Sequence, residues 1–125
     1  MPPIKVGLDP GAMVVTPNGV SLYVTNSQSD VYPISTVSNK AGPPIFFGFN
    51  GNEPLDSAGA LSVTPSGGTI YVATSNAIGD PGAILPIATA TNTVGAPITV
   101  SSDPISVVVG PHGKTAYALD QISTS

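Results

Sequence analysis

The chain has 125 residues, enough for one domain with a hydrophobic core of its own. Only 8% of the residues are charged, with three lysines, no arginine and a net charge of −4. A nucleic-acid-binding surface needs clustered basic side chains and is therefore not expected. The absence of cysteine excludes disulfides, a thiol nucleophile and a cysteine-based metal site. Fourteen glycines and fourteen prolines interrupt the chain every few residues and argue against long helices.

The N-terminal residues 1–5 do not combine a charged region with a following apolar run, so no signal peptide is visible in them. The uninterrupted apolar stretches are far too short to span a membrane. The sequence therefore predicts neither a leader nor a membrane span within these 125 residues.

One phrase occurs three times, in residues 16–24, 64–72 and 110–118, at spacings of 48 and 46 residues. Each copy has a Pro-x-Gly turn followed by a segment that contains a tyrosine. Two further alignments without gaps, of residues 31–45 with 84–98 and of 3–15 with 97–109, complete the repeating unit. A repeat of this length that is made of short strands is typical of propeller blades.

Each unit is expected to contain four strands, named A to D in chain order. The expected A strands are 12–16, 60–64 and 105–109; the B strands 20–25, 69–74 and 115–119; the C strands 31–35 and 84–88; and the D strands 3–7, 44–48 and 97–101. The fold class is thus all-β, with four-stranded antiparallel propeller blades and about two and a half of them. The predicted division of residues 1–125 is strand D of a preceding blade (3–7), a first blade (8–48), a second blade with two loop insertions (49–101) and half of a third (102–125).

Glycine and proline have defined places in this unit. Gly19, Gly67 and Gly113 are expected to supply the positive φ of a tight A–B turn. Pro33 and Pro86 fall in C strands, where a proline lacks the N–H of a central strand. We therefore expect each to lie at a bulge or where its nitrogen points away from a partner.

The motifs resemble the YVTN β-propeller repeat family, also described as lactonase-like propellers. The motifs that carry the resemblance are Pro17-Asn18-Gly19, Tyr23-Val24-Thr25-Asn26, Thr89-Ala90-Thr91-Asn92-Thr93 and Pro97-Ile98-Thr99-Val100. Such propellers are usually seven-bladed, so the chain resembles about a third of one. The resemblance implies a secreted, periplasmic or cell-surface location for a full-length protein, and it leaves the function open, because similar propellers serve as enzymes, binding modules and surface proteins.

An incomplete propeller leaves blade faces and strand edges uncovered. Three explanations stay open: a fragment of a longer chain, a unit that associates with copies of itself, and a truncated reading frame. The expected partners are accordingly the remaining blades or a second copy, besides a protein or small-molecule ligand of unknown kind.

All length variation and all acids fall on one predicted face. The second unit has seven extra residues before strand A, around 49–57, and five extra between strands B and C, around 75–82. In an up-and-down blade the D–A and B–C loops emerge at the same end. The ligand-face candidates in these segments are Asp9, Asp30, Glu53, Asp56, Asp80, Asp103, Asp120 and Phe49. A focused negative field there favours a cation or a basic partner, whereas the Asp-Pro pairs are also ordinary turn starters.

No catalytic constellation is visible. His112 is expected to be a solvated turn residue, and no G-x-S-x-G elbow or His/Cys metal spacing occurs. Asn50, Asn52, Glu53 and Asp56 could offer oxygen ligands to Ca²⁺, although the order of an EF-hand loop is missing, so no cofactor is predicted. The preferred function is a non-enzymatic binding module that uses the acidic face. The alternatives are a fragment of a lactonase-like or streptogramin-lyase-like enzyme and a cell-envelope repeat protein.

Overall fold

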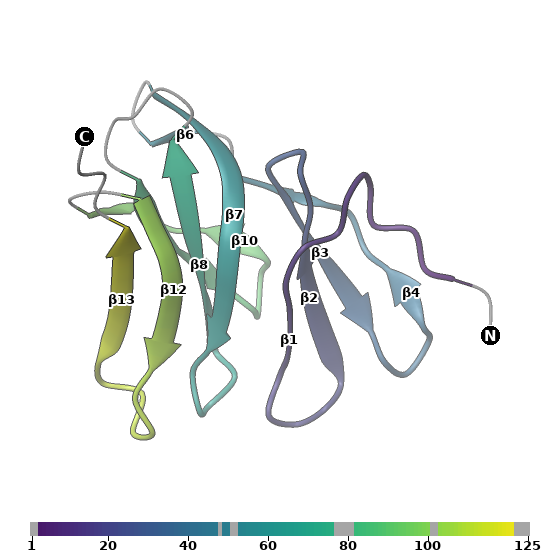
Figure 1. Cartoon of the computed structure of the whole chain (residues 1–125). Coiled ribbons are helices and arrows are strands. Elements are labelled where there is room, and N and C mark those ends of the chain that lie inside the picture. Colours follow the sequence, from purple (N-terminus) through teal and green to yellow (C-terminus); the bar gives the residue numbers. More distant parts are fainter. Residues whose placement is uncertain (1–2, 48, 51–52, 77–81, 101–102, 122–125) are drawn as a thin grey trace.

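The computed structural model describes residues 3–47, 49–50, 53–76, 82–100 and 103–121. Within these residues it contains only strands and turns, with no helix. The strands form three antiparallel sheets that follow one another along the chain (Figure 1). The expected all-β fold class is therefore correct.

The first sheet has the expected order of strands A to D. Its strands are β1 (Met13–Val15), β2 (Ser21–Thr25), β3 (Asp30–Ser35), β4 (Lys40–Ala41) and β5 (Ile45–Phe46). β1 pairs with β2 and β2 with β3, and both β4 and β5 pair with β3. β4 and β5 together thus form the D strand, which is interrupted between them.

The interruption lies opposite the C-strand proline. Ile34 pairs with Ala41, and Val31 pairs with Ile45, so three steps along β3 oppose four along its partner. This extra residue makes a bulge, and the N–H of Gly42 donates to the carbonyl oxygen of Pro33 at 2.7 Å. The second sheet repeats the arrangement at Pro86. The expected bulge is therefore confirmed. Opposite each C-strand proline the ladder is interrupted, so the missing N–H of the proline leaves no hydrogen bond unmade there.

The second sheet also follows the A-to-D order. Its strands are β6 (Phe49–Asn50), β7 (Glu53–Val63), β8 (Thr69–Asn76), β9 (Ala83–Ala88), β10 (Thr93–Val94) and β11 (Ile98–Thr99). The prediction of a loop at 49–57 is wrong, since β6 and the first half of β7 form a hairpin there. The physical reason is that the two insertions flank the same A–B strand pair. The longer β7 and β8 therefore satisfy each other's backbone groups up to Leu55 and Asn76.

The third sheet contains β12 (Asp103–Val109) and β13 (Ala116–Gln121). Both strands run further than expected, so that Asp103 and Asp120 belong to strand ends instead of loops. The expected strand at 3–7 is also wrong for the described residues 3–7, which form no strand. Among the described residues, no strand pairs with this segment. It packs on the face of the first sheet through Val6, Val24 and Ile34, and Asn26 Nδ2 donates to the carbonyl oxygen of Val6 at 3.0 Å.

The three A–B turns have the expected backbone. Gly19, Gly67 and Gly113 have φ of 76°, 78° and 72°, a left-handed region that glycine occupies without the steric cost of a Cβ. In Figure 1 these three hairpin turns lie at the lower end of the sheets. The repeat therefore correctly identified a recurring hairpin.

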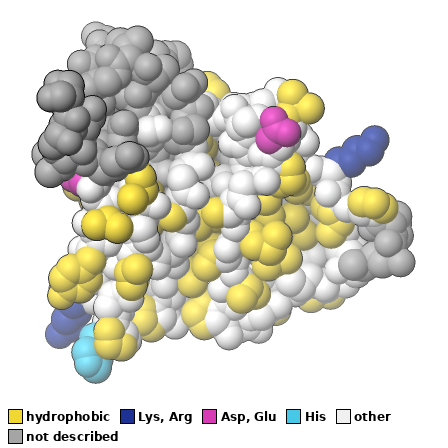
Figure 2. Space-filling model, viewed as in Figure 1, with side chains coloured by type: hydrophobic (Ala, Val, Ile, Leu, Met, Phe, Trp, Pro, Cys, Tyr) yellow, Lys and Arg dark blue, Asp and Glu magenta, His cyan; other side chains and the backbone are white. Residues whose placement is uncertain are grey.

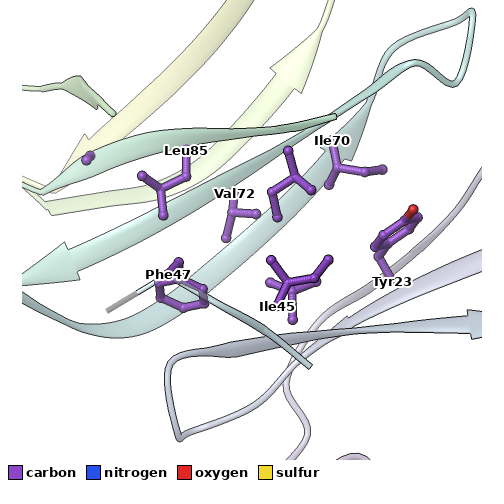
Figure 3. Packing of buried hydrophobic residues seen from close by; sticks show 9 residues of the cluster. Tyr23, Ile45, Phe47, Ile70, Val72 and Leu85 are labelled. Atoms are coloured by element: carbon purple, nitrogen blue, oxygen red, sulfur yellow. The ribbon is translucent and has the colours of Figure 1, made fainter. Parts of the chain in front are cut away.

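The largest core lies between the first and second sheets (Figure 3). The first sheet and the residues after it contribute Tyr23, Val31, Ile45 and Phe47, and the second contributes Ile70, Val72, Ala83, Leu85 and Ile87. Full burial of a Val, Leu, Ile or Phe side chain stabilises a fold by about 1.5–3 kcal/mol. A smaller cluster of Ala73, Ile84 and Val107 joins the second sheet to the third. The three sheets thus pack face to face in sequence.

Candidate acidic end of the sheets

The strand register defines one end of the sheets, opposite the A–B turns, where most of the acids lie. Asp30 begins β3, Glu53 begins β7, and Asp103 begins β12 and pairs with the end of β13. Asp56 and Asp120 are also close to strand ends on this side. We call the described acids of this region, together with Asp9, the acidic end.

Two segments of the first sheet dock on each other at the acidic end. The N–H of Gly11 donates to the carbonyl oxygen of Thr25 at 2.9 Å, and the N–H of Ser27 donates to that of Leu8 at 3.1 Å. The N–H of Leu8 in turn donates to Gln28 Oε1 at 3.3 Å. The segment before β1 and the loop after β2 therefore lie together, as an up-and-down arrangement requires.

Asn26 organises this loop. Its Oδ1 accepts hydrogen bonds from the N–H groups of Gln28, at 2.9 Å, and Asp30, at 3.2 Å, and the side chain is buried. A Cβ on Gly7, which has φ of 81°, would clash with the Asn26 amide. Glycine is thus required at position 7 for the close approach of the two segments. In the sequence, Asn26 stands out only as part of the repeat, and nothing there indicates that its side chain organises the loop.

Three acids of the acidic end have described side chains. Asp9 is exposed and adopts a left-handed φ of 48°, while Asp30 and Asp120 are partly buried. On the surface drawn in Figure 2, acidic side chains lie toward the upper end of the sheets, where one basic side chain is also drawn, and the histidine and another basic side chain lie at the lower end.

The remaining candidates can be placed only in part. Asp80 and Asn52 fall outside the described residues, and for Phe49, Asn50, Glu53, Asp56 and Asp103 the structure describes the backbone alone. The calcium hypothesis falls on these residues and stays a prediction. Among the side chains that are described, no group of three or more His, Cys, Asp or Glu residues could hold a metal ion.

The opposite end carries basic groups. Lys40 begins β4, and His112 and Lys114 lie in the turn between β12 and β13; all three side chains are exposed. His112 is therefore a solvated turn residue, as expected.

A groove of about 560 Å³, which the strand pattern does not predict, opens between the first and second sheets near this basic end. Its wall includes Lys40, the hydroxyls of Ser35 and Ser38, and the Tyr23–Asn92 pair. The Tyr23 hydroxyl donates to Asn92 Oδ1 at 2.7 Å, and burial raises the pKa of the Tyr23 phenol above its ordinary value of 10.0. The repeat showed that both residues recur, but a strand pattern does not reveal which turn faces which tyrosine.

No helix in the described part of the chain is long and apolar enough to cross a membrane. No protein-family model matches the sequence, and no curated protein matches it either.

Solved structures define the class. The chain is similar to a chain of Kuenenia stuttgartiensis hydrazine synthase, a β-propeller-containing protein, with a TM-score of 0.84 and 29% sequence identity. The match covers 98% of this chain, which spans only 33% of the length of that chain. This similarity, together with the antiparallel sheets of the chain itself, shows that the protein is an all-β chain of propeller blades. Membership of the YVTN family remains a prediction.

Proposed function

We propose that this chain is a non-enzymatic binding module of the propeller class, which contacts a cation or a basic partner with its acidic end. The separation of charge along the strands carries the proposal. The backbone places the described acids at one end of the sheets, and Lys40, His112 and Lys114 at the other, while the third lysine, Lys5, is exposed in the segment just before the acidic end. A field of one sign concentrated at one end raises the local concentration of ligands of opposite charge.

The build of the acidic end supports this use. In the first sheet, its segments are tied together by the backbone bonds of Gly11 and Ser27 and by the buried Asn26, so this part of the end has a defined shape before a ligand binds. Such preorganisation lowers the entropic cost of binding. Loops presented by a rigid scaffold are also the usual place for binding functions.

The test is to measure the binding of an oligolysine peptide by calorimetry, at low and at physiological salt concentration. We expect binding that weakens with salt and that drops severalfold in the double variant Asp9→Asn, Asp30→Asn. Asparagine suits the left-handed φ of residue 9, so the fold should be retained. The control Ala96→Lys raises the net charge by one at an exposed position outside the acidic end, which matches the change in either single variant, Asp9→Asn or Asp30→Asn. An equal loss in the control and in these single variants would mean that only net charge matters and would reject the site.

A second candidate is a scaffold segment of a larger enzyme. It is favoured by the identity of 29% to a chain of hydrazine synthase, of which this chain spans 33%. Hydrazine formation by the purified chain would instead make it a self-sufficient enzyme. The scaffold role predicts no product from the chain alone and restored activity when it is added to an enzyme preparation that lacks this segment.

A further inference from the structure

One hydrogen bond between neighbouring sheets involves two positions that recur in the repeat. Tyr23 of the first sheet donates to Asn92 in the turn after β9 of the second. Tyr117 of the third sheet is the repeat equivalent of Tyr23, and Asn39 of the first sheet is that of Asn92. Tyr117 is 66% exposed, Asn39 is exposed and shares the left-handed backbone of Asn92, and neither side chain has a hydrogen-bond partner in the described part of the chain. The two halves of this contact thus recur at opposite ends of the molecule.

A second contact behaves in the same way. Each A–B turn places its glycine against the proline of the preceding turn, where an added Cβ would lie 3.2 or 3.3 Å from the proline Cδ. The two pairs are Gly67 with Pro17 and Gly113 with Pro65. At the ends of the series, a Cβ on Gly19 would meet nothing within 4 Å, and no glycine of the described residues lies against Pro111 as Gly67 does against Pro17. The glycine and the proline that lack this contact thus lie on the first and third sheets, as do the tyrosine and asparagine that lack theirs.

The first sheet has an outward face, directed away from the second sheet, that is apolar. Its apolar residues occupy the repeat positions whose equivalents in the second sheet are buried against the first sheet. Met13 is 65% exposed, and Val15 is also exposed. Five repeat equivalents pair the two sheets: Met13 with Leu61, Val15 with Val63, Leu22 with Ile70, Val24 with Val72 and Ile34 with Ile87. The second-sheet members Ile70, Val72 and Ile87 are fully buried. The first sheet therefore carries the same kind of packing face without a sheet upon it, with Met13 and Val15 exposed and Val24 and Ile34 already buried.

The N-terminal segment covers only part of this face. Ile4 and Val6 pack against Val24 and Ile34, and in the repeat they are equivalent to Ile45 and Phe47 of the first core. They thus take the place of a D strand, and a mostly apolar groove of about 440 Å³ remains between this segment and β1–β2. The strands missing from this position include an A–B pair.

The third sheet consists of an A–B pair. Its face away from the second sheet exposes Val108, Tyr117 and Leu119. Val108 pairs with Tyr117, as Val14 pairs with the equivalent Tyr23 on the face that packs on the second sheet. The exposed face of the third sheet thus matches in kind the face that the first sheet presents to the second.

We propose that a second copy of this chain covers these faces head to tail, with the third sheet of one copy packed on the first sheet of the next. Tyr117 of one copy then donates to Asn39 of the other, and Pro111 lies against Gly19. The contact continues the packing already present between the first and second sheets. Because two different faces meet, the interface is heterologous and can propagate into rings or filaments.

The test is the concentration dependence of mass by analytical ultracentrifugation. The chain of 12.4 kDa should associate, whereas Tyr117→Glu and Met13→Glu, each of which charges one face, should remain monomeric. Mixed in equal amounts, the two variants retain one intact pair of faces and should form a species of twice 12.4 kDa. Gly19→Asn should weaken association about tenfold with little effect on folding, because asparagine tolerates the left-handed backbone and its Cβ meets nothing in the monomer.

The control Ala96→Glu adds the same charge at an exposed position outside both faces and should associate like the unmodified chain. Far-ultraviolet circular dichroism verifies that each variant is folded. The proposal is rejected if the unmodified chain stays monomeric at millimolar concentration, which would leave the faces to an unlike partner or to further blades. It is also rejected if Tyr117→Glu associates normally or if the mixture of variants gives no dimer.

Discussion

The Tyr23 hydroxyl donates a hydrogen bond of 2.7 Å to Asn92 Oδ1, and this bond joins two sheets across 69 residues of sequence. Tyr23 is 2% exposed, at the edge of the main core, while Asn92 stands in an exposed turn with a left-handed φ of 53°. The bond thus holds the turn of the second sheet against the apolar face of the first sheet. Removing it shows whether the two sheets unfold as one cooperative unit.

Removing this hydroxyl should destabilise the fold modestly. We expect Tyr23→Phe to lower the free energy of unfolding by about 1 kcal/mol, the usual net contribution of a hydrogen bond. The ring remains packed, and Asn92 can turn to water. Tyr117→Phe, at the repeat-equivalent exposed position, should change stability by less than about 0.5 kcal/mol. Urea unfolding at low protein concentration measures both, and similar losses would show that the 2.7 Å bond contributes no stability.

The same phenol should make the fold sensitive to alkali. Burial raises the pKa of Tyr23 above 10.0, so the folded state holds the proton more tightly than the unfolded chain does. The resulting stability is fully present below pH 10 and is lost as the pH rises through the folded pKa. Between about pH 8 and about pH 11, the free energy of unfolding should therefore decrease more for the natural chain than for Tyr23→Phe. Equal slopes would contradict the burial effect.

Truncating the centre of the core should be severe. Leu85 is 0% exposed between the first and second sheets, and Leu85→Ala should cost about 2–5 kcal/mol through lost burial and a cavity. Leu8 is 62% exposed and binds its neighbours through its backbone, so Leu8→Ala should cost less than about 0.5 kcal/mol. Thermal unfolding of the pair checks this. A mild Leu85→Ala phenotype would mean that the two sheets do not pack as closely as described.

The repeat made much of this fold predictable, because local turn chemistry is readable from sequence. Gly19 and Pro33 each required a specific backbone, and both the hairpin turn and the bulge followed from that. The β6–β7 hairpin was not foreseen, since polar residues such as Asn50 suit loops as well as strand ends, and only pairing with a neighbouring strand decides between them. Contacts between sheets, such as that of Tyr23 with Asn92, depend on how whole sheets stack, which a strand period does not encode.

At the acidic end, alternation of strand direction was enough to predict that the backbone positions of the described acids lie at one end of the sheets. It was not enough to find Asn26, whose buried amide holds the loop. Its repeat equivalent, Thr74, instead donates to the carbonyl oxygen of Ala83. Because the loops differ in length, equivalent positions have different partners, and the geometry of the end could not be transferred from one unit to the next.

The stacking of the A–B turns separates backbone strain from contact between sheets. Gly19 and Gly67 have nearly the same φ, 76° and 78°, so alanine at either position should cost about 1–2 kcal/mol for the left-handed backbone. At position 67 the new Cβ would also lie 3.2 Å from Pro17 Cδ, whereas at position 19 it meets nothing. Gly67→Ala should therefore be the more destabilising variant by about 1 kcal/mol, the lower range for overpacking.

Urea unfolding of the two alanine variants at low protein concentration measures this difference without self-association. The Gly67→Ala, Pro17→Ala double variant provides the control, because removing the proline ring should relieve the crowding and leave only the backbone strain at residue 67. Stability recovered relative to the sum of the two single variants would demonstrate direct coupling of the turns. If the double variant is instead simply additive, Pro17 does not press on Gly67, and the turns are held in place by their sheets alone.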